Sequence, residues 1–233
     1  MVDQPPDVLG GLADVGRVFF SFPEVLDPAR HRDYNAWHQL DHLPQNRALP
    51  GVRHGERWVR TPRCREASWR SADAAADDFD AAQYVAMYWF ADPVEASVRE
   101  WFRLGEQTEE IGRRPEVAWT RRRFTGFANP TGGAAADGVA VTAGAVPFLP
   151  HAGVVLEVGV EATRDVAELA VEPGVLGAWA FAGTGRHEGL SLTLSWCAAD
   201  PVGVSLARSR TDGLLLRTGL EVVTPGAWDW FDA

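Results

Sequence analysis

The sequence predicts an α+β fold made of two successive βαββαβ units, whose antiparallel sheets pack face to face and whose helices lie outside. Three observations predict it. Two short patterns recur along the chain in the same order, apolar strand-like runs alternate with helical patterns, and 233 residues with 46% hydrophobic content can bury a large core.

The recurring patterns lie in the two halves of the chain. "LPGVRHGERWV" at Leu49–Val59 returns as "EPGVLGAWAFA" at Glu172–Ala182, and "YWFADPVEASV" at Tyr88–Val98 returns as "SWCAADPVGVSL" at Ser195–Leu206. In both halves P-G-V precedes A-D-P-V, which indicates a tandem duplication. The additional residues between the two patterns in the first half form the polar loop 61–81.

The first half begins with a β-rich run, "VGRVFFSF" at Val15–Phe22, which predicts a strand. Asp27 is a suitable N-cap, and Pro28 a suitable first residue, for the helix that follows. Since a proline disfavours the helical conformation of the residue before it, Pro44 predicts that this helix ends near Leu43.

Two strands, a second helix and a final strand complete the first half. We expect strands at Gly51–Arg60 and Ala81–Phe90, and apolar residues on both faces of the latter predict that both faces are buried. Asp92 and Pro93 predict the cap and first residue of the second helix. Its apolar stripe consists of Val94, Val98, Trp101, Phe102 and Ile111. The final strand is expected at Val117–Phe127.

This βαββαβ order is the ferredoxin-like one, and two such units can close an α/β barrel with antiparallel sheets. We expect a first unit at 1–127, a linker at 128–150 rich in Gly and Ala, and a degenerate second unit at 151–233. Within the linker, a short strand is expected near Val139–Val146.

The second unit has lost part of the pattern. Its first strand, Gly153–Val160, is followed by a helix of about ten residues near Thr163–Val171. Only 20 residues separate Gly153 from Pro173, whereas 34 separate Gly16 from Pro50. The missing segment corresponds to the histidine-rich helix of the first unit.

Composition excludes several functions. The net charge of −10 opposes binding to nucleic acid, and the absence of lysine removes Schiff-base and pyridoxal-phosphate chemistry. Cys64 and Cys197 show no disulfide or metal-site spacing, which fits a reducing cytoplasm. No signal peptide is recognisable in "MVDQPPDVLGG", and no apolar run reaches the ~18 residues of a membrane span. We therefore expect a cytoplasmic protein without a membrane or nucleic-acid partner.

The segment "YNAWHQLDHLPQNRALPGV", residues 34–52, resembles a motif of the dimeric α/β-barrel superfamily, in particular its EthD-like and antibiotic-biosynthesis-monooxygenase-like members. These commonly carry N-x-W-[HY]-x-x-[DE]-H-x-P on a first helix, followed by P-G-[FV] at the second strand. The matching residues are Asn35, Trp37, His38, Asp41, His42, Pro44, Pro50 and Gly51. The resemblance implies a barrel closed within one chain or between the chains of a homodimer, with a pocket between sheet and first helix. It does not choose among cofactor-free oxygenation, isomerisation, dehydration, haem chemistry and the absence of activity.

The candidate catalytic residues are His38, His42 and Asp41. The two imidazoles share a helix face and could move a proton to or from a phenol or enol, with Asp41 fixing a tautomer or charge. Structural roles are the alternative: His42 would satisfy carbonyls at the helix end, and Asp41 would accept from an adjacent turn. Neither reading is excluded by the sequence.

The candidate ligand-pocket residues are Asn35, Trp37, Tyr88 and Trp89. His-x-x-x-His has metal-ligand spacing, but no third ligand is identifiable, so neither a metal nor another cofactor is expected. Arg121, Arg122 and Arg123 could receive an anionic ligand, although a solvated or sheet-edge role is favoured because neighbours on a strand face opposite sides.

Two functions remain open. One is a cofactor-independent enzyme that acts on a small apolar or aromatic compound by His-mediated proton transfer, and the other is a non-catalytic barrel for ligand binding or oligomerisation. The aromatic C-terminal tail, with Trp228, Trp230 and Phe231, is expected to dock on its own barrel or on a neighbouring chain.

Overall fold

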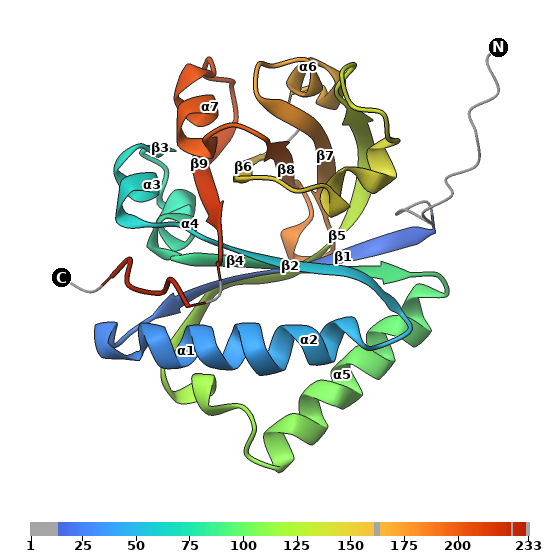
Figure 1. Cartoon of the computed structure of the whole chain (residues 1–233), viewed down its shortest axis with the longest axis vertical. Helices are drawn as coiled ribbons and strands as arrows, with labels where there is room; N and C mark the ends of the chain where they lie inside the picture. The colour runs from blue at the N-terminus through green and yellow to red at the C-terminus, as the bar shows by residue number, and fades with distance from the viewer. Residues whose placement is uncertain (1–13, 161–163, 225, 232–233) are drawn as a thin grey trace.

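The computed structural model describes residues 14–160, 164–224 and 226–231, and it has an α+β fold with a nine-stranded antiparallel sheet (Figure 1). The N-terminal segment 1–11, which is expected to carry no signal peptide, lies outside the described residues. The strands are β1 Val15–Val25, β2 Val52–Val59, β3 Trp69–Arg70, β4 Tyr84–Ala91, β5 Thr120–Ala135, β6 Gly153–Val160, β7 Val175–Gly183, β8 Leu190–Cys197 and β9 Leu214–Val222.

Helices lie between these strands in both halves. They are α1 His31–Trp37, α2 Leu43–Arg47, α3 Pro62–Glu66, α4 Asp77–Ala81, α5 Val94–Glu110, α6 Val166–Ala170 and α7 Pro201–Ala207. A π-helical segment, η2 His38–His42, joins α1 to α2, and the 3-10 turns are η1 Pro28–Arg30, η3 Ala74–Ala76, η4 Pro115–Ala118, η5 Ala143–Phe148 and η6 Gly185–His187. No helix in the described part of the chain is long and apolar enough to cross a membrane.

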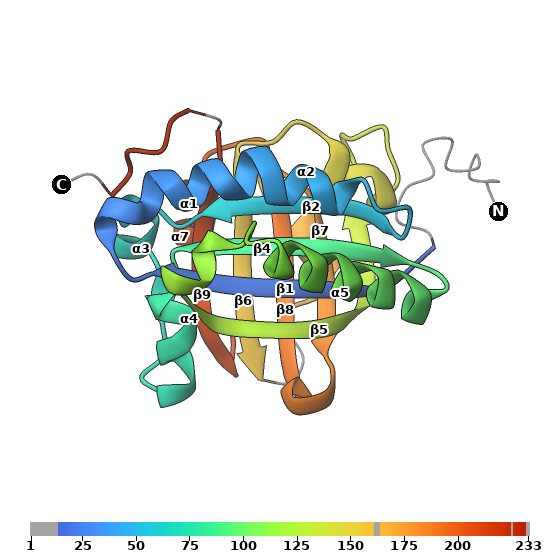
Figure 2. The ribbon, with the colours of Figure 1, turned by 90° about the horizontal axis from the view of Figure 1, so that it is seen from below.

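The two halves use the same strand order. The first half contributes β2-β4-β1-β5 and the second β7-β8-β6-β9, so in both halves the strands run second, third, first, fourth along the sheet. β5 pairs with β7, and β2 pairs with β9 through Trp58–Val222 and Val59–Glu221. The sheet therefore returns on itself, and β3 is added beyond β9. Figure 2 shows the first-half strands running across the second-half strands behind them.

The main hydrophobic core lies between the two sets of strands. Alternation along each strand places one face of β1, β4, β6 and β8 inward. The inward residues include Phe20, Trp89, Leu156, Leu194 and Trp196, each at most 1% exposed. Every residue of β4 is buried, which confirms the prediction that both faces of this strand are covered.

The histidine-rich helix does not end before Pro44, contrary to the prediction. Helical structure continues through α2 to Arg47 because the preceding turn is π-helical, with the amide of Leu43 bonded to the carbonyl of His38. Widening this turn accommodates a proline that lacks an amide proton, which a regular α-helix accepts poorly. The predicted N-cap at Asp27 is confirmed, since its side chain accepts from the amide of Ala29 over 3.0 Å.

Other predicted boundaries also shift. β5 extends to Ala135 and pairs with β7, so the first part of the expected linker 128–150 is sheet. The expected short strand near Val139–Val146 is wrong, because Ala143–Phe148 is a 3-10 turn. Pro93 is the N-cap rather than the first residue of α5, and Phe102 and Ile111 of its apolar stripe are exposed.

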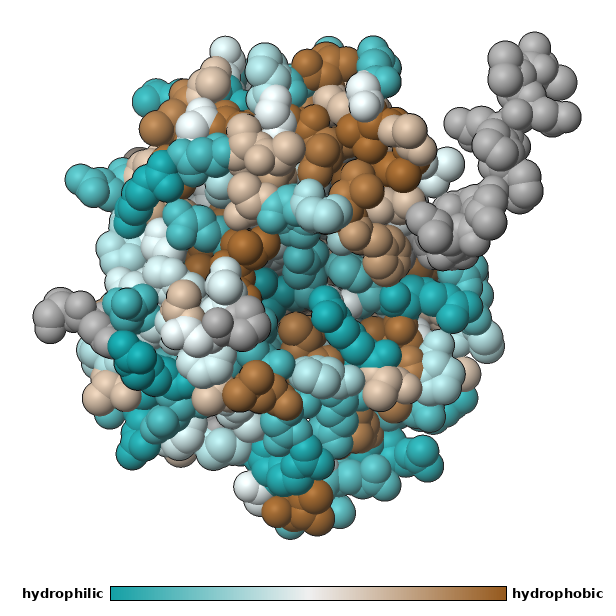
Figure 3. Space-filling model, in the orientation of Figure 1, coloured by the Kyte–Doolittle hydropathy of each residue, from teal (hydrophilic) through white to brown (hydrophobic). Residues whose placement is uncertain are grey.

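Helices of different length cover the outer faces of the two halves. Helical residues 28–47 and the 17-residue α5 lie over the first half, whereas five-residue α6 and seven-residue α7 lie over the second (Figure 1). On the face shown in Figure 3, polar residues predominate over the helices at the bottom of the view. The C-terminal aromatic residues Trp228, Trp230 and Phe231 pack on their own chain, against a cluster that includes Tyr34 and Tyr84.

Candidate functional site

A cavity of about 270 Å3 lies between the outer face of the first half and its helices. The β1 and β4 side chains form its floor, the α1–η2–α2 segment forms one wall and α5 forms the other. The lining residues are Phe19, Ser21, Pro23, Tyr34, Trp37, His38, His42, Gln45, Asn46, Ala86, Tyr88, Trp101, Phe102, Leu104, Gly105, Glu106, Thr108, Glu109, Arg114, Thr120 and Arg122. This volume is slightly below the usual range of small-ligand sites, roughly 300–1,000 Å3.

Strand alternation separates two of the three aromatic residues that were expected in the pocket, Tyr88 and Trp89. Tyr88 faces the cavity, whereas Trp89 points to the opposite side of β4 and joins the core between the sheets. There its ring lies 5.2 Å from those of Trp179 and Phe181. The assignment of Trp89 to the pocket is therefore wrong, because adjacent residues of a strand face opposite sides.

The π-helical segment presents both candidate histidines to the cavity. The rings of His38 and His42 lie 5.1 Å apart at an interplanar angle of 76°. Trp37 stacks on His42 at 4.6 Å and donates from its indole nitrogen to the carbonyl of Arg113 over 2.8 Å. The wall that carries the histidines is thus attached to the chain that follows α5.

Both imidazoles are held neutral. Burial lowers the pKa of His38 well below its usual value, and the positive charge of Arg57 lowers it further. Burial, followed by the charges of Arg114, Arg122 and Arg57, lowers the pKa of His42 to about 3. At neutral pH each ring therefore has one N–H and one lone pair.

The hydrogen bonds of Asn46 assign the His42 tautomer. The Nδ2 group of Asn46 donates to the carbonyl of His42 over 2.6 Å, and it lies 3.2 Å from Nδ1 of the same residue. An amide NH2 can only donate, so Nδ1 of His42 accepts and the ring proton is on Nε2. His38 differs, because its buried Nδ1 has no hydrogen-bond partner.

Asp41 does not act on either imidazole. Its carboxylate, about a third exposed, is paired with the guanidinium of Arg113 at the surface. The expectation that Asp41 fixes a tautomer or charge in the site is therefore not supported by its position, since its carboxylate points toward the chain that follows α5. Asn46, which the sequence analysis did not select, contacts His42 instead.

Arg57 is a buried cation that the sequence analysis missed. It is 3% exposed, and its guanidinium carbon lies 4.3 Å from the ring centre of Tyr84 and 4.7 Å from that of Tyr34. Among the described residues, its one side-chain hydrogen bond runs from Nη2 to Asn35 Oδ1, at 2.6 Å, and Nε and Nη1 have no partner. No carboxylate of the described residues forms an ion pair with it.

Asn35 supports this cation rather than lining the cavity. Its Oδ1 accepts from Arg57, and its Nδ2 donates to the hydroxyl of Tyr84 over 2.9 Å. That hydroxyl also lies 2.8 Å from Nδ1 of His31, whose ring is stacked on Phe231 at 4.1 Å. Asn35 on the first helix thus belongs to a network that orients Arg57. Among the described residues, no group of three or more His, Cys, Asp or Glu side chains is placed to hold a metal ion.

Comparison with known proteins supports the fold. No family model matches the chain, and no curated protein matches it in sequence. A solved structure from Fusobacterium nucleatum subsp. nucleatum, proposed to be a monooxygenase, is similar with a TM-score of 0.56 and 6% identity, over 90% of this chain and 94% of that one. An anthrone oxidase-like protein is similar with a TM-score of 0.53 and 10% identity, over 92% and 94% of the two chains. At such identities the similarity is one of fold.

Proposed function

We propose that this protein is a small-molecule enzyme that binds an aromatic phenol or an enolisable aromatic ketone and transfers a proton from it to His38. The observation that carries the proposal is a pair of neutral imidazoles, His38 buried and His42 partly buried, near a guanidinium, that of Arg57, which has no ion-pair partner among the described residues. The aromatic side chains around the cavity, among them Phe19, Trp37 and Trp101, suit a flat apolar ligand.

The electrostatics of the site favour an anion. The charge that lowers the pKa of His38 also lowers the pKa of an acidic ligand bound beside it. Once the proton has moved, the ligand anion lies between imidazolium and guanidinium, so the product of the transfer is stabilised more than the reactant. The lowered pKa of His38 in the protein without ligand is therefore compatible with proton transfer to His38 in the complex.

The two histidines have different roles in this proposal. A lone pair of His38 accepts the proton, so the ligand O–H or C–H bond breaks, an N–H bond forms and the electron pair stays on the ligand as a phenolate or enolate. The Nε2–H group of His42 and the guanidinium of Arg57 stabilise the developing oxyanion. The step is balanced without a metal or redox cofactor.

We also propose that the chain is a tandem duplication of ferredoxin-like units that closes as an α/β barrel of the EthD-like or antibiotic-biosynthesis-monooxygenase-like type. The common strand order of the two halves, the β2–β9 pairing and the motif between Asn35 and Gly51 support it. The units would divide between β5 and β6, within residues 136–152.

Deuterium exchange into anthrone tests the catalytic step. Anthrone is an enolisable aromatic ketone, and the second structural neighbour is named for it. Incubated without oxygen in deuterated buffer, its acidic CH2 group should exchange faster with the protein than without it, as followed by NMR. We expect His38→Gln to lower the protein-dependent rate by about 100-fold or more.

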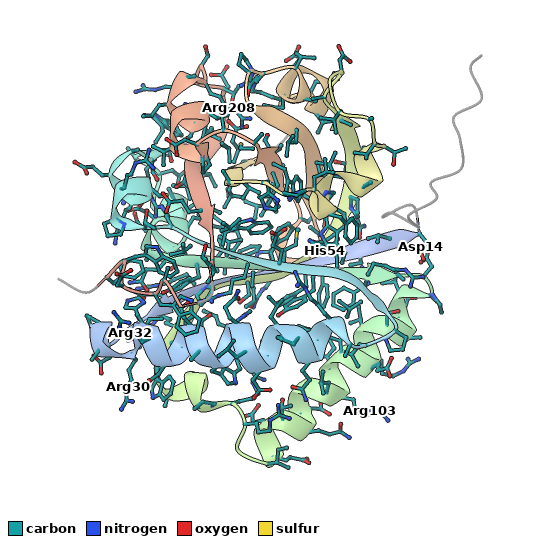
Figure 4. All side chains as sticks on the ribbon, viewed as in Figure 1. Asp14, Arg30, Arg32, His54, Arg103 and Arg208 are labelled. Carbon is teal, nitrogen blue, oxygen red and sulfur yellow. The ribbon has the colours of Figure 1, made fainter. Side chains whose placement is uncertain are left out.

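A second variant and a control separate the roles of charge and fold. Arg57→Met keeps similar volume and should lower the exchange rate roughly 100-fold, because the enolate loses its counter-charge. Arg103→Gln removes an arginine on the outward side of α5 (Figure 4) and should leave the rate unchanged. Saturable binding of anthrone without accelerated exchange would instead support the non-catalytic binding protein.

A further inference from the structure

We infer that the ligand of this site carries a second, anionic group, which binds at a subsite formed by the guanidinium groups of Arg122 and Arg186 beside His187. The inference rests on the proposed function, because it assigns the second group to the compound that occupies the first cavity. It adds a substrate class: aromatic phenols or ketones that bear a carboxylate or a similar oxyanion.

A second cavity of about 420 Å3 adjoins the first. The two share four lining residues, Phe19, Trp101, Phe102 and Arg122, so they lie on either side of one aromatic wall. The remaining residues of the second cavity are Thr125, Gly126, Phe127, Thr184, Gly185, Arg186 and His187. Of the residues that the structure describes, no acidic one lines it, whereas two arginines do.

The turn that carries Arg186 comes from the other half of the molecule and is firmly attached to β5. Thr184 donates from both its amide and its hydroxyl to the carbonyl of Phe127, each over 3.0 Å. His187 Nε2 lies 2.8 Å from the carbonyl of Thr125. A side chain at Gly126 would place Cβ only 2.5 Å from the His187 ring, so the close approach of this turn requires glycine there.

The guanidinium of Arg186 is oriented but not neutralised. Its Nη2 donates to the carbonyl and hydroxyl of Thr125 over 2.8 and 3.1 Å. No carboxylate of the described residues forms an ion pair with it. Arg123 of β5 shows the contrast, because its guanidinium pairs with the carboxylate of Glu24 at 2.7 Å.

The chemistry of this subsite fits an oxyanion. A guanidinium presents several fixed N–H donors and binds carboxylate, sulfonate or phosphate oxygens in a forked geometry. Arg122 lines both cavities, so an aromatic compound seated in the first can extend past the half-exposed Phe102 and place its anionic group between Arg122 and Arg186.

Two matched probes test the inference by calorimetry: 2-naphthol, and 6-hydroxy-2-naphthoate, which adds a carboxylate at the far end of the same ring system. We expect the carboxylate to bind about 10-fold more tightly at low salt, with the preference reduced in 0.5 M NaCl because the pair is exposed to solvent. Arg186→Gln should abolish the preference and leave the affinity for 2-naphthol unchanged.

Arg103→Gln is the matched control, since it removes the same charge from an exposed position that lines neither cavity. It should alter neither affinity. Equal binding of the two probes, or an Arg186→Gln effect of equal size on both, would overturn the subsite while leaving the proposed function intact. Failure of both probes to bind, together with no anthrone exchange, would overturn the two proposals at once.

Discussion

The two halves of the molecule fill the space above the outer face of their strands in different ways. In the first half, long helices leave a cavity lined by neutral histidines, and the buried Arg57 nearby has no ion-pair partner among the described residues. In the second half, where the covering helices have five and seven residues, arginine and glutamate side chains fill the space instead.

The charges of the second half are paired with one another. Arg208, which Figure 4 labels, bonds to Glu172 at 2.6 Å and to Ser195 at 2.8 Å. Glu157 lies 3.6 Å from both Arg208 and Arg217, and these three side chains are at most 5% exposed. A buried charge needs a partner of opposite sign. The second half contains that partner within the chain, whereas in the first half a ligand can supply it.

Breaking the paired cluster should have the largest effect. Glu157→Gln leaves Arg208 and Arg217 without the charge between them, so we expect the free energy of unfolding in urea to fall by about 3–5 kcal/mol. Glu188→Gln, an exposed substitution in the same half, should change it by less than about 0.5 kcal/mol. If Glu157→Gln were as mild as this control, the contrast between the halves would be lost.

The second-largest effect should be a loss of stability at acidic pH, which arises from His42 in the first half. His42 has a pKa of about 3 in the folded protein against 6.5 as the ordinary value, so the unfolded chain binds more protons between these pH values. Stability is therefore present above pH 6.5 and falls as the pH drops toward 3. Between pH 7.5 and pH 5, the free energy of unfolding of the wild type should fall by about 2 kcal/mol more than that of His42→Gln. Urea unfolding of both proteins at the two pH values measures it, and parallel behaviour would show that His42 is not held neutral.

The contact between His151 and Glu56, which joins the halves, should stabilise the protein at low pH and weaken as the pH rises, opposite to His42. His151, just before β6, has Nδ1 2.9 Å from the carbonyl of Leu149 and Nε2 3.0 Å from the carboxylate of Glu56 of β2, so its protonated ring can donate to both. Burial opposes this charge, but the hydrogen bond and charge of Glu56 outweigh burial and raise the pKa of His151. Burial also opposes the Glu56 carboxylate, but hydrogen bonds from His151 and His54 lower its pKa to about 2.

A raised histidine pKa gives stability that is fully present below about pH 6.5 and is lost as the pH rises through the folded value. Wild type should therefore lose about 1 kcal/mol of unfolding free energy between pH 6 and pH 9, consistent with a single charged hydrogen bond. His151→Gln should flatten this part of the profile, as measured by urea unfolding across the range. A decline of the same size in the variant would assign it to another group.

Local signals predicted much of the fold. The N-cap Asp27, the buried strand β4 and the order of the main strands and helices follow from residues within a few positions of each other. The position of His38 and His42 on one helix face is also local. Trp89 was misplaced although the alternation of β4 already put it opposite Tyr88, so that error could have been avoided from the sequence.

Other parts of the site depend on residues far apart in the chain. Arg57 stands in β2, VRHGERWV, where several polar residues are neighbours and nothing local marks this one as buried. Asp41 is drawn to Arg113, 72 positions away, rather than to a neighbouring histidine. Arg186 reaches the first-half cavity only because β7 pairs with β5.

The sequence by itself determined the main strands and helices, because caps, prolines and periodicity act over one or two turns, but it did not predict α3, β3 and α4 within the segment expected to be a polar loop. The tertiary structure alone decided which charges are neutralised, because that depends on strand register and on the contact between the halves. Glu157 and Arg217 are directly opposed in the β6–β9 register, whereas Arg57 contacts Asn35 and two tyrosine rings and no carboxylate of the described residues. Since Coulomb interactions act through space and burial strengthens them, the difference between a filled half and a binding half appears only once the strands are paired.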